Sequence, residues 1–184
     1  MIEFRFDAFE LQYLCMVAER RNCGKQPNGV RNRRCDGQND FSLNLHGVMG
    51  EYAVAKYLGA EIDTSISLKG DDKIADLRCS GKSIQVKVNM GRWSTKYLYF
   101  NSIDLFRADA AVLVIIRSAT EVELAGWIAK SEFSGMASER NFGHGKRFCV
   151  ESTKLRPIKT LKAILNEPNG NDGKGVLHER TYPH

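Results

Sequence analysis

The feature of the sequence that most constrains the fold is a nearly unbroken apolar run, AAVLVIIR, at residues 110–117. A strand with one face in water alternates apolar and polar side chains, whereas a run like this one is typical of a strand covered on both faces. A covered strand needs a layer of structure on each side of its sheet. The run therefore predicts a central strand in a layered fold.

The remaining segments supply those layers. Apolar spacing predicts helices at 8–21, 42–58 and 131–140, and Gly59 is a natural stop for the second of them. Patterns rich in β-branched residues predict strands at 61–68, 74–79, 82–89, 121–128 and 147–152, with a further strand or extended segment at 96–101. The order of these elements predicts an α/β fold with a mixed central β-sheet flanked by helices.

The length of 184 residues fits one domain, which we expect at residues 1–167 with a polar, glycine-rich tail at 168–184. A hydrophobic content of 42% is enough for a real core. No segment reaches the length of a membrane-spanning helix, and the N-terminus has acidic residues where a secretory signal has a basic start. The five cysteines are scattered without a CxxC pair, so we expect reduced thiols and a cytoplasmic location.

The net charge of +5 is unevenly distributed. Residues 20–35 include six basic and no acidic side chains, and the proline and glycines among them predict an exposed loop. Such a loop either binds phosphates or is simply solvated. The candidate phosphate contacts in it are Arg31, Arg33 and Arg34. A zinc site is a further alternative, although the spacing of its ligands matches no standard module. Its ligands would be Cys15, Cys23, Cys35 and His46.

The strands at 74–79 and 82–89 form a hairpin through a Ser-Gly turn. Side chains alternate along a strand, so Gln85 and Lys87 share one face while Val86 takes the other. Asp76 lies on the neighbouring antiparallel strand. We therefore expect a carboxylate, an amide oxygen and an ammonium group to converge near one point. The alternative is a structural ion pair between Asp76 and Lys87.

Glu51 joins this group from the helix at 42–58. Its neighbours three and four positions away are glycine or apolar residues, so its carboxylate faces the core side of the helix, where an unpaired charge is costly. We expect Lys87 or a divalent metal ion to provide the compensating charge. The alternative is that Glu51 lies on a surface.

These groups suit phosphodiester hydrolysis, which uses a hard cation such as Mg²⁺ (or Mn²⁺ in its place) held by oxygen ligands. We expect Asp76 to be the main ligand, with the side-chain oxygen of Gln85 and the main-chain carbonyl of Val86 beside it. Glu51 would hold the water shell of the metal or a second ion. Lys87 would orient or deprotonate the attacking water and offset the growing negative charge.

Three segments carry a resemblance to a known family: Gly50-Glu51-x-x-Val54-Ala55-x-x-Leu58, Ala75-Asp76 and Gln85-Val86-Lys87. They resemble the PD-(D/E)xK nuclease superfamily over roughly residues 42–130, with Ala75 in place of the proline and Gln85 in place of the second acid. The resemblance implies a restriction-endonuclease-like core and a magnesium-dependent endonuclease that acts on DNA, with RNA not excluded and a homodimer possible. The alternative is a nucleic-acid-binding protein that keeps this fold without cleaving.

Outside this motif, basic residues mixed with aromatic ones are typical of backbone contact and base stacking. The segment GRWSTKYLYF provides Arg92 and Lys96, and the loop before the last strand provides Lys146 and Arg147. The alternative is that the aromatic side chains pack on the sheet and the basic ones are only solvated.

Overall fold

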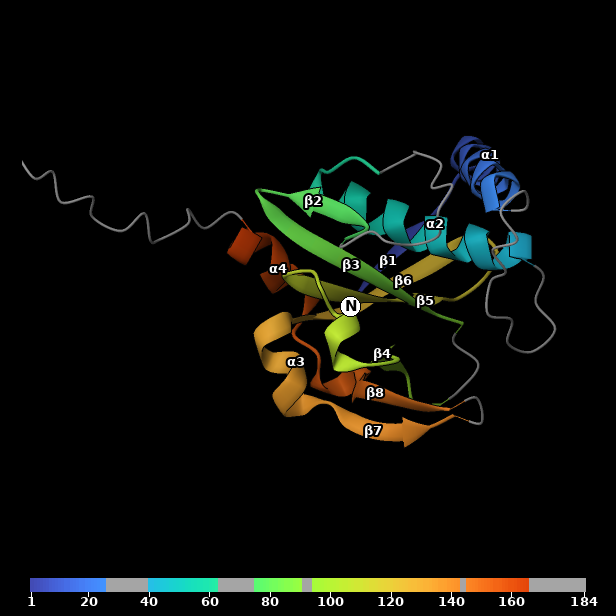
Figure 1. Ribbon diagram of the computed structural model, residues 1–184. Coiled ribbons are helices and arrows are strands. Elements are labelled where there is room, and N and C mark those ends of the chain that lie inside the picture. Colours follow the sequence, from blue (N-terminus) through green and yellow to red (C-terminus); the bar gives the residue numbers. More distant parts are fainter. Residues whose placement is uncertain (26–39, 63–74, 91–93, 143–144, 166–184) are drawn as a thin grey trace, which may run out of the picture.

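The structure is a computed structural model that describes residues 1–25, 40–62, 75–90, 94–142 and 145–165. It has three layers (Figure 1). Helices α1 (Ala8–Lys25) and α2 (Asp40–Leu58) cover one face of a five-stranded sheet, and a three-stranded sheet lies against the other face. Two hydrophobic cores, one on each face of the larger sheet, hold the layers together.

The larger sheet has the strand order β1-β6-β5-β3-β2. Its strands are β1 (Ile2–Arg5), β2 (Leu77–Cys79), β3 (Lys82–Asn89), β5 (Ala110–Ile116) and β6 (Glu121–Ala129). The pair β3–β5 is parallel and the other pairs are antiparallel. The prediction of a mixed central sheet flanked by helices is therefore confirmed.

All seven residues of β5 are buried, as its apolar run predicts. Val112, Val114 and Ile116 belong to the core on the side of α1 and α2. The alternating residues Ala111, Leu113 and Ile115 belong to the core on the side of the smaller sheet. The strand is therefore shared by both cores.

The smaller sheet has the order β4-β8-β7 and is antiparallel throughout. Its strands are β4 (Tyr97–Phe100), β7 (Ser138–Asn141) and β8 (Lys146–Glu151). Between the sheets, the Phe100 ring stacks on Phe106 at 4.7 Å and meets Phe133 edge-on at 5.2 Å. The short helix η2 (Ile103–Leu105) and helix α3 (Lys130–Met136) bring these aromatic residues to the second core.

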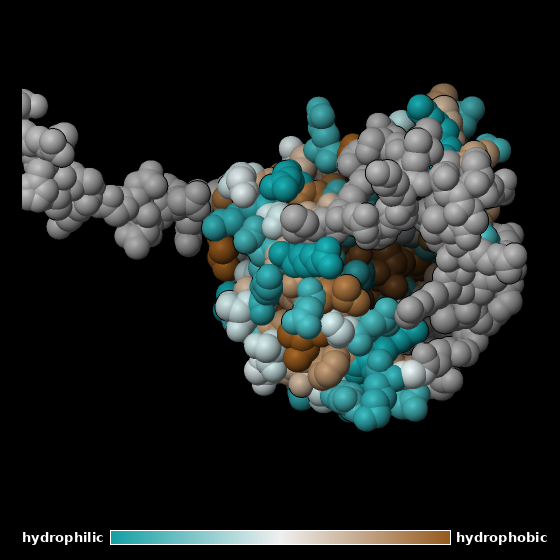
Figure 2. Space-filling model, in the orientation of Figure 1, coloured by the Kyte–Doolittle hydropathy of each residue, from teal (hydrophilic) through white to brown (hydrophobic). Residues whose placement is uncertain are grey.

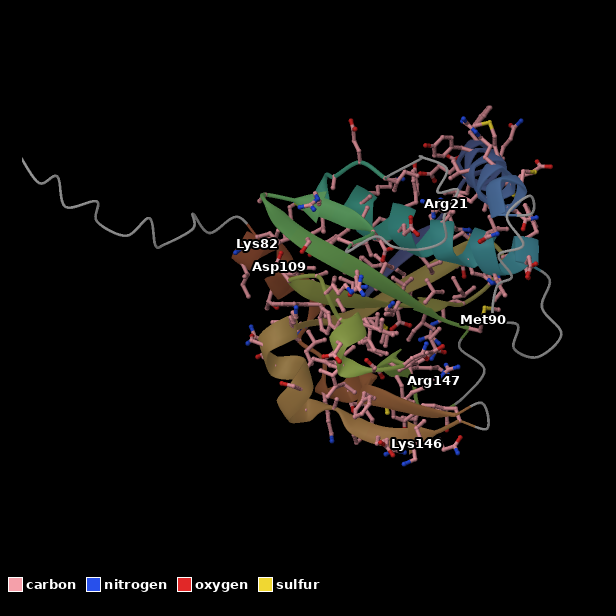
Figure 3. The ribbon with its side chains drawn as sticks, in the orientation of Figure 1. Arg21, Lys82, Met90, Asp109, Lys146 and Arg147 are labelled. Atoms are coloured by element: carbon pink, nitrogen blue, oxygen red, sulfur yellow. The ribbon has the colours of Figure 1, made fainter. Side chains whose placement is uncertain are left out.

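A tight turn and a pair of hydrogen bonds fix the position of β3, the strand that carries the predicted motif. At the turn before it, Ser80 and Gly81 have positive φ values of 49° and 75°, as a tight hairpin turn requires. At its start, the Asp109 carboxylate accepts hydrogen bonds from the N–H of Ser83 at 2.7 Å and from its hydroxyl at 2.6 Å. Figure 3 shows Asp109 beside Lys82, where β5 and β3 begin together.

Several predicted boundaries are wrong. The predicted basic loop at 20–35 begins too early, because α1 continues through Lys25 and places Arg20 and Arg21 on a helix. Arginine and lysine are good helix formers, and the packing of α1 on α2 extends the helix. The predicted helix at 131–140 ends at Met136, and residues 138–141 instead pair with β8. Pairing across the sheet overrides the local preference there.

Other elements were not predicted or cannot be compared. Strand β1 and helix α4 (Ile158–Leu165) are present in the structure but were not predicted from the sequence. The predicted strand at 61–68 falls largely outside the described residues, and so do most of the basic loop and the whole tail at 168–184. None of the helices in the described ranges is long and apolar enough to cross a lipid bilayer.

Candidate active site

Asp76 lies at the point where the hairpin strands separate. The main-chain N–H of Asp76 donates to the Ile84 carbonyl at 2.9 Å, which extends the pairing one residue beyond β2. The N–H of Val86 then donates to Oδ2 of Asp76 at 2.6 Å. The carboxylate therefore takes the place of a main-chain carbonyl and lies along the edge of β3.

Val86 presents its main chain to the same edge. The N–H and C=O of one strand residue point to the same side, so the Val86 carbonyl faces the edge on which Asp76 lies. The Val86 side chain is buried in the core beneath α2. The two oxygen donors expected from Asp76 and Val86 are thus brought together by main-chain geometry.

Gln85 is held by the segment that follows η2. Its Nε2 donates to the Leu105 carbonyl at 3.4 Å, and its Oε1 accepts from the Arg107 N–H at 3.2 Å. Both ends of the amide thus have partners inside the protein, which fixes which end is oxygen. An amide oxygen has two acceptor positions, so Oε1 keeps one position beyond the bond to Arg107.

Lys87 lies two residues further along β3, on the face that carries Gln85. Its Nζ is 4.6 Å from the centroid of the Phe100 ring, which is 3% exposed. No ion pair joins Lys87 to Asp76 among the described residues, although both side chains belong to this hairpin. The alternative of a structural ion pair between these two residues is therefore wrong.

Glu51 has a different cation partner from the two that we expected. Arg21 of α1 donates from both terminal nitrogens to the two carboxylate oxygens, at 2.9 Å and 2.7 Å. The side chains of Arg21 and Glu51 are only 17% and 13% exposed. This bidentate geometry makes the contact strong and directional. The structure thus joins Asp76 to Val86 at the edge of β3 and places Gln85 and Lys87 on one face of that strand, where they contact residues 105–107 and Phe100. Glu51 is bound to a neighbouring helix.

Helix α2 nevertheless crosses β3 at the level of the motif. A Cβ atom added to Gly50 would lie 2.6 Å from Val88 Cγ2 and 3.4 Å from Val86 Cγ1. The helix backbone beside Glu51 thus touches the face of β3 opposite to Gln85 and Lys87. Close approach is the physical reason for a glycine at this position.

The groups at the hairpin edge are oxygen ligands, which is the kind that Mg²⁺ prefers. Within the described ranges, no group of three or more His, Cys, Asp or Glu side chains is placed to hold a metal ion. Mg²⁺ needs fewer, because it is commonly bound through one or two carboxylates together with substrate phosphates and water. The Asp76 carboxylate and the Val86 carbonyl lie at this edge, while the Gln85 amide oxygen accepts a hydrogen bond from the Arg107 N–H. For the zinc alternative, Cys15 and Cys23 are free thiols and Cys35 lies outside the described residues.

The predicted nucleic-acid contacts are only partly described. Arg147 lies over the Tyr99 ring at 4.5 Å, and Lys146 pairs with Glu139 at 2.7 Å. Lys96 precedes β4, and its carbonyl accepts from the Ser152 N–H at 2.8 Å. In Figure 3, Lys146 and Arg147 lie on the same side of the molecule as Met90, which follows β3. Outside the described residues are Arg31, Arg33, Arg34 and Arg92.

Sequence reasoning missed two contacts of the motif. Arg21 was predicted to lie in an exposed basic loop that either binds phosphates or is solvated, whereas it lies on α1 and pairs with Glu51. The bond between Gln85 and residues 105–107 has no local signal, because it joins segments that are 20 residues apart. Comparison with protein-family models gives no match for this chain, and comparison with curated proteins gives none either.

Proposed function

We propose that the protein is an intracellular, metal-dependent nuclease that hydrolyses phosphodiester bonds in DNA. The observation that carries the proposal is the Asp76 carboxylate, which Val86 binds at the edge of β3 between the positions of Gln85 and Lys87. Carboxylate, carbonyl, amide oxygen and ammonium groups then come from one short stretch of hairpin. The order α2, β2, β3, β5 also supports the proposal of a restriction-endonuclease-like core.

In this proposal Asp76, the Val86 carbonyl and Oε1 of Gln85 are the residues that hold Mg²⁺. When bound, the ion polarises the phosphoryl oxygen and lowers the pKa of water. Lys87 orients the attacking water and balances the negative charge that develops on the phosphate. Its ammonium group has no carboxylate partner among the described residues, which supports a role toward a substrate anion.

Glu51 has a supporting role. Its pairing with Arg21 neutralises the carboxylate and joins α1 to α2 at the level where α2 crosses β3. From there the helix supports the strand that carries Val86 and Lys87. For a role in the metal's water shell, the Glu51 carboxylate would have to accept hydrogen bonds from that water as well as from Arg21.

The second candidate is a protein that binds nucleic acid without cleaving it. The observation that favours it is Gln85, whose amide has a protein partner at each end and which brings no negative charge to the metal site. A site with a single carboxylate binds Mg²⁺ more weakly than a site with two. The two candidates differ in cleavage and not in fold.

The deciding experiment incubates supercoiled plasmid with the purified chain and Mg²⁺ or Mn²⁺, with and without chelator. We expect nicking that the chelator abolishes and that Lys87→Ala reduces by about 10²- to 10³-fold. Lys82→Ala is the matched control, because it removes the same side chain from the start of the same strand. A labelled RNA in parallel separates the two substrates.

Circular dichroism of each variant checks that it is folded. The nuclease proposal is refuted if the parent chain cuts neither nucleic acid with either ion, or if Lys87→Ala cuts as fast as Lys82→Ala. A gel shift of the same DNA without cleavage would favour the second candidate.

A further inference from the structure

The outer face of the smaller sheet has an unusual set of side chains. Leu98 and Phe100 of β4 point into the core between the sheets, so Tyr97 and Tyr99 point outward. On the neighbouring strands Arg140 and Arg147 lie opposite each other, and Phe142 follows the end of β7. This sheet is the outermost layer of the described structure (Figure 1). We name the five residues Tyr97, Tyr99, Arg140, Phe142 and Arg147 the aromatic–arginine face.

The members of this face contact one another in a continuous series. The Arg140 guanidinium lies 5.0 Å from the Tyr97 ring centroid, and the Arg147 guanidinium lies 4.5 Å from that of Tyr99. The Phe142 ring lies 5.6 Å from Tyr97 and 6.0 Å from Tyr99. Three rings and two planar cations therefore form one surface layer.

The face is also partly exposed and positively charged. Phe142 is 38% exposed and the Arg140 side chain is 48% exposed, while Tyr97, Tyr99 and Arg147 are half-buried. Glu151 is the acid on this side of the sheet, and it forms an exposed ion pair with Arg140, a weak contact that a phosphate can replace. Lys146 and Glu139 pair with each other on the opposite side of the sheet. In the space-filling view, hydrophilic residues dominate the part of the molecule where β7 and β8 lie (Figure 2).

An antiparallel sheet that faces water normally carries polar side chains on that face. Here it carries flat aromatic rings with guanidinium planes on them. Both kinds of plane stack on nucleobases, and guanidinium groups also bind phosphate oxygens. The surface thus combines the two chemistries that recognise an unpaired nucleic-acid strand.

We propose that the aromatic–arginine face binds single-stranded nucleic acid. Bases stack on Phe142 and on the guanidinium planes that Tyr97 and Tyr99 support, and the N–H groups at the edges of the two arginines contact the phosphates. A duplex does not fit this chemistry, because its base faces are already stacked on each other and cannot stack on the protein. This inference deepens the proposed nuclease function by naming an unpaired strand as part of its substrate.

The face is joined to the candidate active site through β4. Lys87 rests on the Phe100 ring, and Phe100 is the next residue after Tyr99. Phe100 pairs with Phe148, which is the next residue after Arg147. The Lys87 contact is therefore one residue away from the outer face along β4, and the residue paired with Phe100 is one residue away from it along β8. A strand that wraps around the edge of β4 can reach both.

The test measures binding by fluorescence anisotropy in the presence of chelator, so that no cleavage occurs. The probes are a labelled oligo(dT) of about 16 nucleotides and the same strand in a duplex. We expect the parent chain to bind the single strand at least about tenfold more tightly than the duplex. Tyr99→Ser is expected to weaken single-strand binding by about 5- to 100-fold, and Tyr99→Phe to leave it within about twofold.

Two further variants separate stacking from charge. Arg147→Lys keeps the positive charge and removes the planar group, so it should weaken binding if the guanidinium stacks. Lys162→Ala is the control, because it removes one positive charge and one cation–π contact, with Tyr57, on another element. Phe142→Ala repeats the aromatic test at an exposed position, in case Tyr99→Ser does not fold.

The inference is overturned if duplex and single strand bind equally, or if the folded aromatic variants bind oligo(dT) as tightly as the parent chain. Its failure is distinct from that of the nuclease proposal. A chain that cleaves plasmid but shows no single-strand preference keeps the nuclease function and loses this face. A chain that cleaves nothing but shows the expected binding pattern loses the nuclease function and keeps the face.

Discussion

Helix α2 lies close to β3 at Gly50, and the same helix has a second glycine, Gly47, at which an added Cβ atom would meet no neighbour. A Cβ atom at position 50 would lie 2.6 Å from Val88 Cγ2, which is shorter than a carbon–carbon contact, whereas at position 47 no atom lies within 4 Å. The two alanine variants therefore share one change in helix propensity and differ only in the contact with β3.

The expected size of each effect follows from these contacts. Replacing a mid-helix glycine with alanine stabilises the helix by about 1 kcal/mol, so Gly47→Ala should raise the free energy of unfolding by roughly that amount. At position 50 the same gain is opposed by overpacking, which costs about 1–3 kcal/mol. Valine cannot easily turn Cγ2 away, because its χ1 is restricted. We therefore expect Gly50→Ala to be less stable than Gly47→Ala by about 1–3 kcal/mol.

Urea unfolding followed by far-UV circular dichroism measures this difference directly, with the slope of the transition as a check that unfolding stays two-state. The plasmid assay on the same two proteins adds a second readout, since a displaced α2 also shifts β3 beneath Val86 and Lys87. If Gly50→Ala proves as stable as Gly47→Ala, then α2 and β3 are not in the tight contact on which the role of Glu51 as a support depends.

Two other contacts, that of Asp109 with Ser83 and that of Arg21 with Glu51, lead to further testable predictions. Hydrogen bonds from the Ser83 hydroxyl and N–H lower the pKa of Asp109 below its usual value of 3.8, so this carboxylate stabilises the fold above that pH, and its contribution is lost as the pH falls through the lower folded-state pKa. The stability difference between the parent chain and Asp109→Asn should therefore be largest near neutral pH and shrink in acid, and acid titrations of both proteins that run parallel would contradict it. For Arg21 and Glu51, a double-mutant cycle with alanine should give a coupling energy of about 1.5–3 kcal/mol, since both charges are partly buried and bidentate, whereas a coupling near zero would mean that the pair is merely a surface contact.

Local patterns were enough to predict the centre of the fold. Strand β5 and the hairpin of β2 and β3 each have a sequence signal within a few residues. For β5 the signal is the unbroken apolar run, and for the hairpin it is the Ser-Gly turn. These signals do not depend on the rest of the chain, and the structure confirms both elements. They also bring Asp76 beside Val86, because the turn alone sets which residues face each other.

The elements that were missed depend on distant partners or on a pattern that was overlooked. The sequence of β7, SERN, has four exposed polar residues and no apolar alternation, so only its pairing with β8 makes it a strand. Helix α4 did have a signal, since Ile158, Leu161 and Leu165 are spaced as one buried helix face. The partner of Glu51 is 30 residues away, and its identity follows only from how α1 packs on α2.

The alternation along β5 also affects how the molecule opens. Successive residues of this strand are anchored in different cores, so neither core can be lost without breaking half of the strand's buried contacts. We therefore expect partial opening that releases only one layer to be disfavoured, and the two layers to behave as one cooperative unit. The tyrosines and arginines of the outermost sheet should then keep a fixed position relative to the hairpin in the folded protein.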